Sequence, residues 1–152
     1  LVLPWQSERC VSVWQGAKQA KGRQRWQATA LQAAKQARRT RVPAVDEVRD
    51  TRALIAWVAQ TVQSGGVVLV LHEEARTPIS TAMESMRLPA PGSAPLVLAV
   101  VVGPEGGISP EETAALEAAG AMTVRLGPHV MRTASAGPVA LAVLAYTSGL
   151  WE

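Results

Sequence analysis

The second two-thirds of the chain alternates between apolar runs and segments with apolar residues at helical spacing. Three apolar runs, at residues 67–71, 96–102 and 122–126, are predicted to be the central strands. The first two are wholly apolar, as is typical of strands buried on both faces of a parallel sheet. Helical spacing predicts helices at 51–63, 76–86, 109–119 and 133–148. This alternation predicts an α/β fold with a mostly parallel sheet and helices on both faces.

The first third of the chain has a weaker pattern. Residues 1–4 are interpreted as the end of a strand, and the alternation over 9–14 predicts another short strand. A helix is predicted at 22–39, with basic residues on one side and an inward apolar face of Trp26, Ala30, Ala33, Ala34 and Ala37. The shorter expected features are a strand near Val45 and Val48, a loop over 88–95, and Pro138 in the first turns of the last helix or at a kink.

Two glycine-bearing turns follow the second and third apolar runs, at 103–109 and 127–133. Ligands of open α/β sheets bind at the carboxyl ends of the strands, so both turns are expected to border one pocket. The first turn has three glycines, more than a plain connection between two elements needs, namely Gly103, Gly106 and Gly107. This number favours close approach of a ligand to the backbone. Glu105, at the tip of the first turn, could hold a ribose hydroxyl, act as a base or be merely solvated.

Three further groups of polar residues have both a structural and a functional interpretation. His72, Glu73 and Glu74 follow the first central strand, and either face the pocket or begin a helix. The pattern from Ser109 to Glu112 is a capping box with proline at the first helical position, which by itself accounts for these residues. Arg132 either caps a turn or meets a phosphate or a polarised base carbonyl, which the fork of its guanidinium suits.

The net charge of +3 conceals a strong asymmetry. Residues 9–45 contain nine basic and no acidic residues, whereas the rest of the chain has six basic and all twelve acidic ones. Such a cluster indicates a phosphate-bearing partner, and Trp14 and Trp26 within it could stack on bases. The alternative is a solvated helix face with both tryptophans turned inward. The candidate RNA-binding residues are Arg9, Lys18, Lys21, Arg23, Arg25, Arg38 and Arg39.

Several classes of protein are disfavoured by the sequence. It has neither the dinucleotide fingerprint nor the P-loop, no nucleophile elbow, and no histidine or cysteine spacing that suggests a metal. Its single cysteine, Cys10, excludes an internal disulfide, is expected to be a small buried hydrophobe, and favours the reducing cytoplasm. No signal-peptide pattern is present, and the apolar runs are too short to span a membrane, so a cytoplasmic protein is expected.

Taken together, these motifs resemble the ribosomal RNA small subunit methyltransferase E family of the SPOUT superfamily. The resemblance covers nearly the whole chain, and the pairing of its glycine loop with the later Leu-Gly-Pro and Arg-Thr motifs is specific. The residues that carry it are Gly103 to Ser109 with Glu111 and Glu112, Leu126 to Pro128, Met131 to Thr133, Pro4 to Arg9, and Gln32 to Arg39.

The resemblance implies an α/β trefoil knot that binds S-adenosylmethionine (SAM), a homodimer, and methylation of N3 of one uridine in 16S ribosomal RNA of the small subunit. Arg132 would stabilise charge on the uracil oxygens, and Glu105 is the weaker candidate for a base. The cofactor would lie between three loops that contain Leu71, His72, Val102, Gly103, Pro104, Glu105, Gly106, Gly107, Leu126, Gly127, Val130, Met131 and Arg132.

The chain also departs from the family pattern. Members usually carry an N-terminal RNA-binding barrel and then a first strand and helix, so residues 1–152 are expected to be a catalytic domain without those parts. The common Arg-Thr-Glu-Thr-Ala appears as Arg132 to Ala136 without its carboxylate, and His129 stands where arginine is frequent.

Two other functions stay open on the sequence. The first is a related knotted enzyme that methylates ribose 2′-oxygens; the absence of asparagine from the whole chain disfavours it, because that branch has an asparagine-rich last motif. The second is a non-catalytic RNA-binding module that shares the fold. Measurable SAM affinity would distinguish it from an enzyme.

Overall fold

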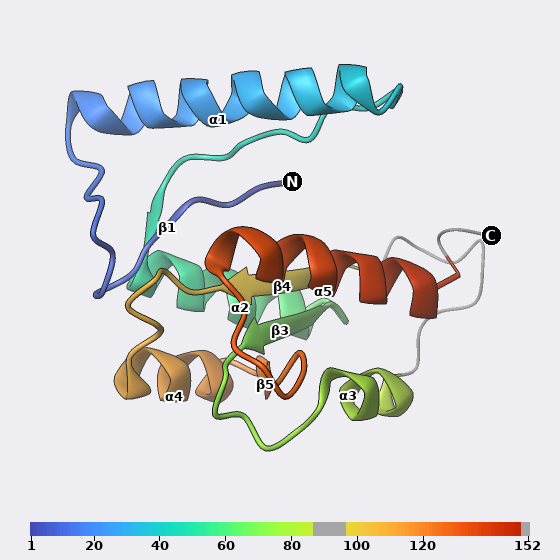
Figure 1. Cartoon of the computed structure of the whole chain (residues 1–152). Coiled ribbons are helices and arrows are strands. Elements are labelled where there is room, and N and C mark those ends of the chain that lie inside the picture. The colour runs from blue at the N-terminus through green and yellow to red at the C-terminus, as the bar shows by residue number, and fades with distance from the viewer. Residues whose placement is uncertain (87–96, 150–152) are drawn as a thin grey trace.

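The computed structural model describes residues 1–86 and 97–149, and its centre is a three-stranded parallel sheet (Figure 1). The strand β3 (Val67–Leu71) lies between β4 (Leu98–Val102) and β5 (Met122–Val124). All five residues of β3 pair with β4, and its last three pair with β5. Since Leu71 pairs with both Val102 and Val124, the three strands end at the same edge, and their loops emerge together.

Both faces of this sheet are covered by helices because the side chains of β3 alternate between two apolar clusters. Val68 and Val70 pack with buried residues of α2 (Thr51–Gln63) and α4 (Pro110–Ala118). Leu69 packs on the opposite face with α3 (Ile79–Ser85) and α5 (Thr133–Thr147). The described sheet pairings are all parallel, so the predicted α/β architecture with helices on both faces is confirmed.

The local sequence explains where the helices of this layer begin. Asp50 caps α2, its carboxylate accepting a hydrogen bond from the Ala53 amide at 2.7 Å. At α4 the predicted capping box is present, followed by Pro110 at the first position. Pro138 lies in the second turn of α5, as one of the two expected placements requires.

The first third of the chain is built differently. The strand β1 (Trp5–Gln6) pairs in parallel with β2 (Arg49–Asp50), and a bridge joins Val2 to Val45. These residues form a second sheet, separate in the described structure from the β4-β3-β5 sheet, where one sheet was expected. The long helix α1 (Ala17–Gln36) runs above the three-stranded sheet and apart from it (Figure 1), but hydrogen bonds from Arg23 and to Gln27 tie it to Val45 of the second sheet.

The prediction for α1 was wrong in two respects. The helix begins at Ala17 rather than at residue 22, so Gly22 lies inside it. A glycine is required at this position because a Cβ there would lie 2.7 Å from the Trp14 indole. Of the expected inward apolar face only Ala34 is buried, whereas Ala33 and Ala37 are exposed and Trp26 is 40% exposed. A separate surface helix leaves alanines in solvent, which periodicity alone does not reveal.

The strand expected over 9–14 is also wrong, since the described structure has turns and bends there. Val11 and Val13 are exposed, and the Trp14 amide donates to the side-chain oxygen of Gln6 at 2.8 Å instead of to a neighbouring strand. An alternating pattern forms a strand only where a partner strand lies alongside.

Other boundaries differ by a few residues. The segments 1–4 and 45–48, where strands were expected, contain only the isolated bridge between Val2 and Val45. The strands β1 and β2 begin directly after them, at Trp5 and Arg49. Three elements end earlier than expected, namely α1, α3 and β5, whose last residues are Gln36, Ser85 and Val124. The expected loop at 88–95 and the first residue of the 96–102 run lie outside the described residues. No helix in the described ranges is long and apolar enough to cross a membrane.

Candidate functional site

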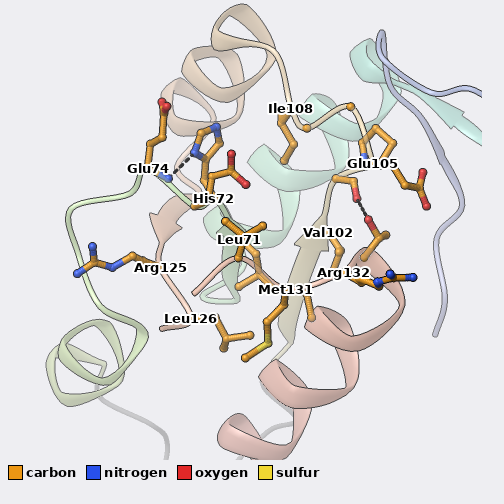
Figure 2. A pocket seen from close by; sticks show the side chains of 18 of the residues that line it. Leu71, His72, Glu74, Val102, Glu105, Ile108, Arg125, Leu126, Met131 and Arg132 are labelled. Atoms are coloured by element: carbon orange, nitrogen blue, oxygen red, sulfur yellow. Dashed lines mark hydrogen bonds between the residues drawn. The ribbon is translucent and has the colours of Figure 1, made fainter. Parts of the chain in front are cut away.

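A pocket of about 780 Å³ lies at the carboxyl edge of the three-stranded sheet (Figure 2). It is bordered by the loops that follow β3, β4 and β5 and by the start of α5, so the expectation that the two glycine turns share one pocket is confirmed. Each of the thirteen predicted cofactor residues lines it: Leu71, His72, Val102, Gly103, Pro104, Glu105, Gly106, Gly107, Leu126, Gly127, Val130, Met131 and Arg132.

The pocket also contains residues that were not predicted for it. Arg9, a candidate for RNA binding, reaches it from the N-terminal segment, and Arg125 borders it after β5. Thr133 was identified only as part of a motif, yet its hydroxyl donates to the Gly103 carbonyl at 3.2 Å and joins the start of α5 to the glycine loop. Nothing in the spacing of the sequence indicates these approaches, because they depend on how distant segments pack.

The loop after β3 is tied to β5 by its backbone. The His72 amide donates to the Val124 carbonyl at 3.0 Å, and the His72 Nδ1 accepts from the Glu74 amide at 3.2 Å. Glu73 and Glu74 are exposed and line the pocket edge. Since α3 begins only at Ile79, the interpretation of these carboxylates as a helix start is wrong.

Each glycine of the loop after β4 has a different packing requirement. A Cβ at Gly103 would lie 2.6 Å from the Ile108 side chain, and one at Gly106 would lie 3.0 Å from the Arg9 carbonyl oxygen. Gly107 has a φ of +74° and closes a turn by donating to the Pro104 carbonyl. The fold itself therefore explains these glycines, which weakens their use as evidence for a ligand.

Gly127 gives better evidence for an open site. A Cβ at Gly127 would meet no described atom within 4 Å, and its φ is not in the left-handed region. The residue lines the pocket, so neither packing nor backbone strain accounts for a glycine there. A missing side chain at this position keeps the backbone of the loop accessible from the pocket.

The two candidate catalytic residues, Glu105 and Arg132, both have exposed side chains on the pocket rim. Arg132 is the N-cap residue of α5 and makes no side-chain cap. Figure 2 shows Glu105 and Arg132 at one end of the pocket, with His72 and Glu74 at the other. Within residues 1–86 and 97–149 the single ion pair is elsewhere, so Glu105 and Arg132 do not neutralise each other.

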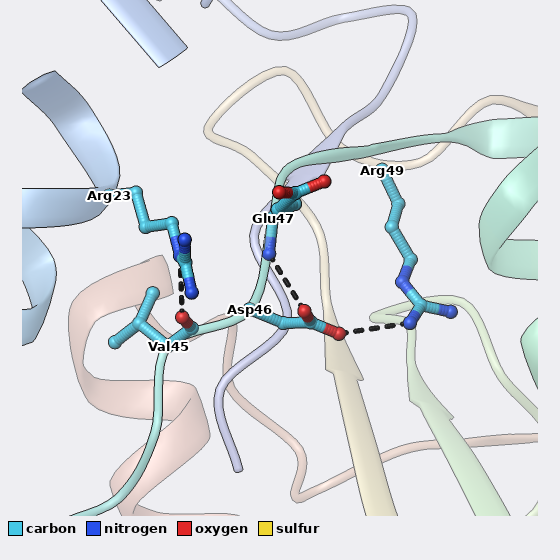
Figure 3. A network of polar contacts seen from close by, with 5 residues as sticks. All are labelled: Arg23, Val45, Asp46, Glu47 and Arg49. Atoms are coloured by element: carbon cyan, nitrogen blue, oxygen red, sulfur yellow. Dashed lines mark hydrogen bonds and ion pairs between the residues drawn. The ribbon is translucent and has the colours of Figure 1, made fainter. Parts of the chain in front are cut away.

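The candidate RNA-binding residues are all exposed, but they are not equivalent. Lys18, Lys21 and Arg25 lie along α1, whereas the Arg23 Nε donates to the Val45 carbonyl at 2.8 Å (Figure 3). Arg38 and Arg39 follow the end of α1. Arg38 has a φ of +51°, and the Arg39 amide donates to Ala34, which is the geometry of a Schellman cap.

The tryptophans of the basic region pack against each other rather than standing free. The rings of Trp14 and Trp26 meet edge to face, with centroids 5.2 Å apart, and Trp14 also lies on Gly22. This arrangement favours the inward interpretation for Trp14. Both residues line a second, more apolar groove of about 860 Å³, which runs between the β1 segment, β4 and α5. Cys10, expected to be buried, is half-buried, with its Sγ 3.3 Å from the Ser7 hydroxyl.

The carboxyl group of Asp46, in the segment that leads into β2, has a shifted pKa. The pKa of Asp46 lies below its ordinary value because its carboxylate accepts from the Glu47 amide and pairs with Arg49 at 2.9 Å (Figure 3). This pair lies outside the lining of the pocket. In the described ranges no group of three or more His, Cys, Asp or Glu residues could hold a metal ion.

Comparison with known proteins agrees with this geometry. A family model described as an RNA methyltransferase domain matches residues 1–145. A Mycobacterium bovis protein named ribosomal RNA small subunit methyltransferase E is 47% identical over 150 residues, which are 99% of this chain and 54% of that protein. The chain spans about half the length of the curated relatives that it matches.

Two solved structures have the same fold over almost the whole chain. A Neisseria gonorrhoeae ribosomal RNA small subunit methyltransferase E bound to S-adenosyl methionine has a TM-score of 0.77 at 26% identity and covers 95% of this chain and 53% of its own. A Legionella pneumophila protein classed as a methyltransferase, in complex with SAM, has a TM-score of 0.72 at 28% identity over 95% of this chain and 54% of its own. With its pocket at the carboxyl edge of a parallel sheet, the chain belongs to the RNA methyltransferase domain family.

Proposed function

We propose that this chain is the catalytic domain of a SAM-dependent enzyme that methylates N3 of a single uridine in 16S ribosomal RNA. The observation that carries the proposal is the convergence of three loops from β3, β4 and β5 on one pocket lined by every predicted cofactor residue. The names of the M. bovis and N. gonorrhoeae proteins support the RNA substrate, and the two SAM-bound structures support the cofactor.

The pocket fits a cofactor of this kind. Its volume of about 780 Å³ suits a nucleoside-sized ligand, and the half-buried Leu71, Val102 and Leu126 provide apolar walls. Gly127 leaves its loop backbone open to the pocket, and the first amides of α5 lack partners within their own helix. We infer that backbone groups of the three loops, more than charged side chains, hold SAM.

SAM, when bound, supplies a methyl group on a sulfonium, which transfers without covalent help from the protein once the acceptor is in line. The chain must therefore position the uracil and stabilise the charge left when N3 loses its proton. Arg132 is suited to this role because its guanidinium is exposed on the rim and has no ion-pair partner among the described residues. Glu105, on the same rim, is the weaker candidate for the base that takes the proton.

The RNA is proposed to lie across the exposed cations of α1 and of its C-terminal end. Lys18, Lys21 and Arg25 line the helix, and Arg38 and Arg39 extend the positive surface beyond it. Arg9 connects this basic region to the pocket, because its side chain donates to the Gly106 carbonyl at 3.4 Å. Arg23 contributes charge, but its bond to Val45 gives it a structural role as well.

A homodimer is proposed from the surface of α5. This helix is apolar on nearly all sides, yet Val139, Leu141 and Tyr146 are exposed, as are Val130 and Met131 just before it. A helix that is apolar all round is normally buried, which favours a second copy of the chain as the covering partner. Sedimentation analysis tests this proposal, and a Tyr146→Glu variant, at a residue 75% exposed and outside the apolar groove, should shift a dimer toward monomer.

We also propose the trefoil knot, which is supported by the crossing of the chain from β5 to α5 on the far side of the sheet. After β5, at one side of the sheet, the chain crosses to β4 at the other side, where α5 packs and Thr133 bonds to Gly103. The expected first strand and helix of the family, in a chain that has them, would fit the apolar groove beside β4, which pairs only with β3 in the described ranges. Residues 1–152 then form the rest of the catalytic domain.

The proposal is tested by calorimetric titration with SAM and with S-adenosylhomocysteine, then by incubation with 16S RNA and with small subunits. Stoichiometric binding of both cofactor forms and the appearance of 3-methyluridine are the expected results. A 2′-O-methylated nucleoside would instead identify a ribose methyltransferase. RNA binding without SAM binding would identify a non-catalytic module.

A further inference from the structure

The carboxylate of Glu112 lies buried where three distant parts of the chain meet. Glu112 is 6% exposed and occupies the third position of α4. The capping box accounts for two of its bonds: its amide donates to the Ser109 hydroxyl at 3.3 Å, and its Oε2 accepts from the Ser109 amide at 3.4 Å. The other carboxylate oxygen, Oε1, has no part in capping.

Oε1 accepts two hydrogen bonds from segments far away in the sequence. The Thr51 hydroxyl donates to it at 2.6 Å, and the Glu8 amide donates to it at 2.9 Å. The Thr51 oxygen in turn accepts from the Trp5 indole Nε1 at 3.2 Å. One carboxylate thus joins the start of α4 to the start of α2 and to the segment that follows β1.

These bonds compensate a buried charge. No cation pairs with Glu112 within the part of the chain that the structure describes, so the carboxylate depends on its three neutral donors and on the N-terminus of α4. Buried carboxylates held this way bond strongly to each donor, because hydrogen bonds to charged groups are stronger than neutral ones. The donor segments are therefore fixed relative to α4.

The segment fixed at Glu8 reaches the pocket one residue later. The backbone of Arg9 lies so close to Gly106 that a Cβ there would be 3.0 Å from the Arg9 carbonyl oxygen and 3.1 Å from its Cβ. The Arg9 guanidinium donates to the Gly106 carbonyl at 3.4 Å, and both residues line the pocket. The position of the glycine loop is thus linked to Glu112 from two sides, through Arg9 and through Ser109.

We propose that Glu112 is a positioning residue for the cofactor pocket: its carboxylate holds residues 7–9 against the 103–107 loop and so sets the shape of that rim. The proposal rests on the proposed function in that the rim is taken to bind SAM. It goes beyond capping, which explains Ser109 and leaves the bonds to Glu8 and Thr51 without a role.

The test compares Glu112→Gln with Glu111→Gln. Both remove one charge from the first turn of α4, but Glu111 is exposed and lies outside the network. In Glu112→Gln one carboxylate oxygen becomes an NH₂ group that cannot accept, and the loss of the charge weakens every bond that remains, including those from Glu8 and Thr51. Hydrogen exchange of the amides of residues 7–9, 103 and 105–107 should accelerate about tenfold, the effect of losing one bond to a charged group, while the control matches the native chain.

Calorimetry with SAM gives the second readout. The dissociation constant should rise roughly tenfold in Glu112→Gln and stay unchanged in Glu111→Gln. Thr51→Val, which removes one of the two donors to Oε1, should change both readouts in the same direction, and the two substitutions should be non-additive. If the native chain does not bind SAM, the proposed function fails, but the exchange measurement still decides the role of Glu112.

Two results would overturn the inference. Unchanged exchange at 7–9 and 103–107 in Glu112→Gln would show that the carboxylate does not hold these segments together. Exchange that accelerates equally at the buried β3 residues Val68 and Val70 would show that Glu112 contributes only to global stability. The proposal requires acceleration at the rim with the centre of the sheet still protected.

Discussion

The two parts of this molecule obey the same physical chemistry but use it differently. In the three-stranded sheet and its helices, both faces of β3 are covered, and Val68, Leu69 and Val70 are at most 1% exposed. In the first third, a helix of 20 residues buries only Gly22 and Ala34, within a region the structure describes throughout. Apolar periodicity predicts structure reliably where both faces of an element are covered, as in β3, and it misleads where most of an element faces solvent, as in α1.

The largest expected effect comes from making the same substitution in both parts. Leu116→Ala, at a fully buried position of α4, should lower the free energy of unfolding by about 2–5 kcal/mol. Leu31→Ala on α1, where the side chain is 38% exposed, should change it by less than about 0.5 kcal/mol. Urea denaturation of both variants checks the contrast, and equal losses would show that α1 is as tightly packed as the sheet.

Substitutions in the pocket and on the basic surface should affect two different steps, methyl transfer for Arg132→Ala and RNA binding for the lysine variants. Methyl transfer should fall about 10²–10³-fold, as when one group that stabilises developing charge is removed, with a much smaller loss of SAM affinity. Lys18→Ala and Lys21→Ala should weaken RNA binding at every sequence and reduce its salt dependence by about one unit each. Single-turnover kinetics and binding at several salt concentrations measure the two effects, and retained turnover in Arg132→Ala would exclude its proposed role.

Two glycines of the pocket should respond in opposite ways to alanine. At Gly103 the Cβ would press on Ile108 at 2.6 Å, so Gly103→Ala should lower stability by about 1–3 kcal/mol. At Gly127 the space is open, so Gly127→Ala should leave the melting temperature unchanged and weaken SAM binding. Thermal melts and calorimetry on both variants provide the check, and undiminished SAM affinity in Gly127→Ala would place the ligand elsewhere.

Arg38→Gly should stabilise the first third of the chain while weakening its proposed function. Arg38 adopts a φ of +51° at the position of a Schellman cap where glycine is preferred. Relief of this strain should raise the free energy of unfolding by about 1 kcal/mol, whereas RNA affinity should fall with the lost charge. Denaturation and RNA titration of the same variant test both halves, and Arg39→Gly serves as the control for charge alone.

The smallest effect should come from Asp46. Because its pKa is lowered in the folded chain, its contribution to stability is complete above the ordinary aspartate range and is lost as the pH falls through the folded pKa. The pair with Arg49 is partly exposed, so the contribution should stay below about 1 kcal/mol. Asp46→Asn should abolish this part of the acid dependence, which melts between pH 5 and pH 2 would detect.

Local sequence alone determined the centre of this protein. The apolar runs fixed β3 at the residues expected, Asp50 and Ser109 fixed the starts of two helices, and the glycine turns correctly indicated a shared pocket. These features succeed because capping and burial on two faces depend on neighbouring residues and on the pattern within one element.

Tertiary structure decided what joins distant segments. Residues 9–14, which alternate in sequence, form a bend in which the Trp14 amide donates to Gln6. Gly22 packs against the Trp14 indole, and Arg9 and Thr133 lie at the pocket. Tertiary structure also gave Glu112, which the sequence explains fully as a cap, two further bonds to residues 61 and 104 positions away. Such contacts depend on the relative placement of whole elements, and no pattern within a single element encodes that placement.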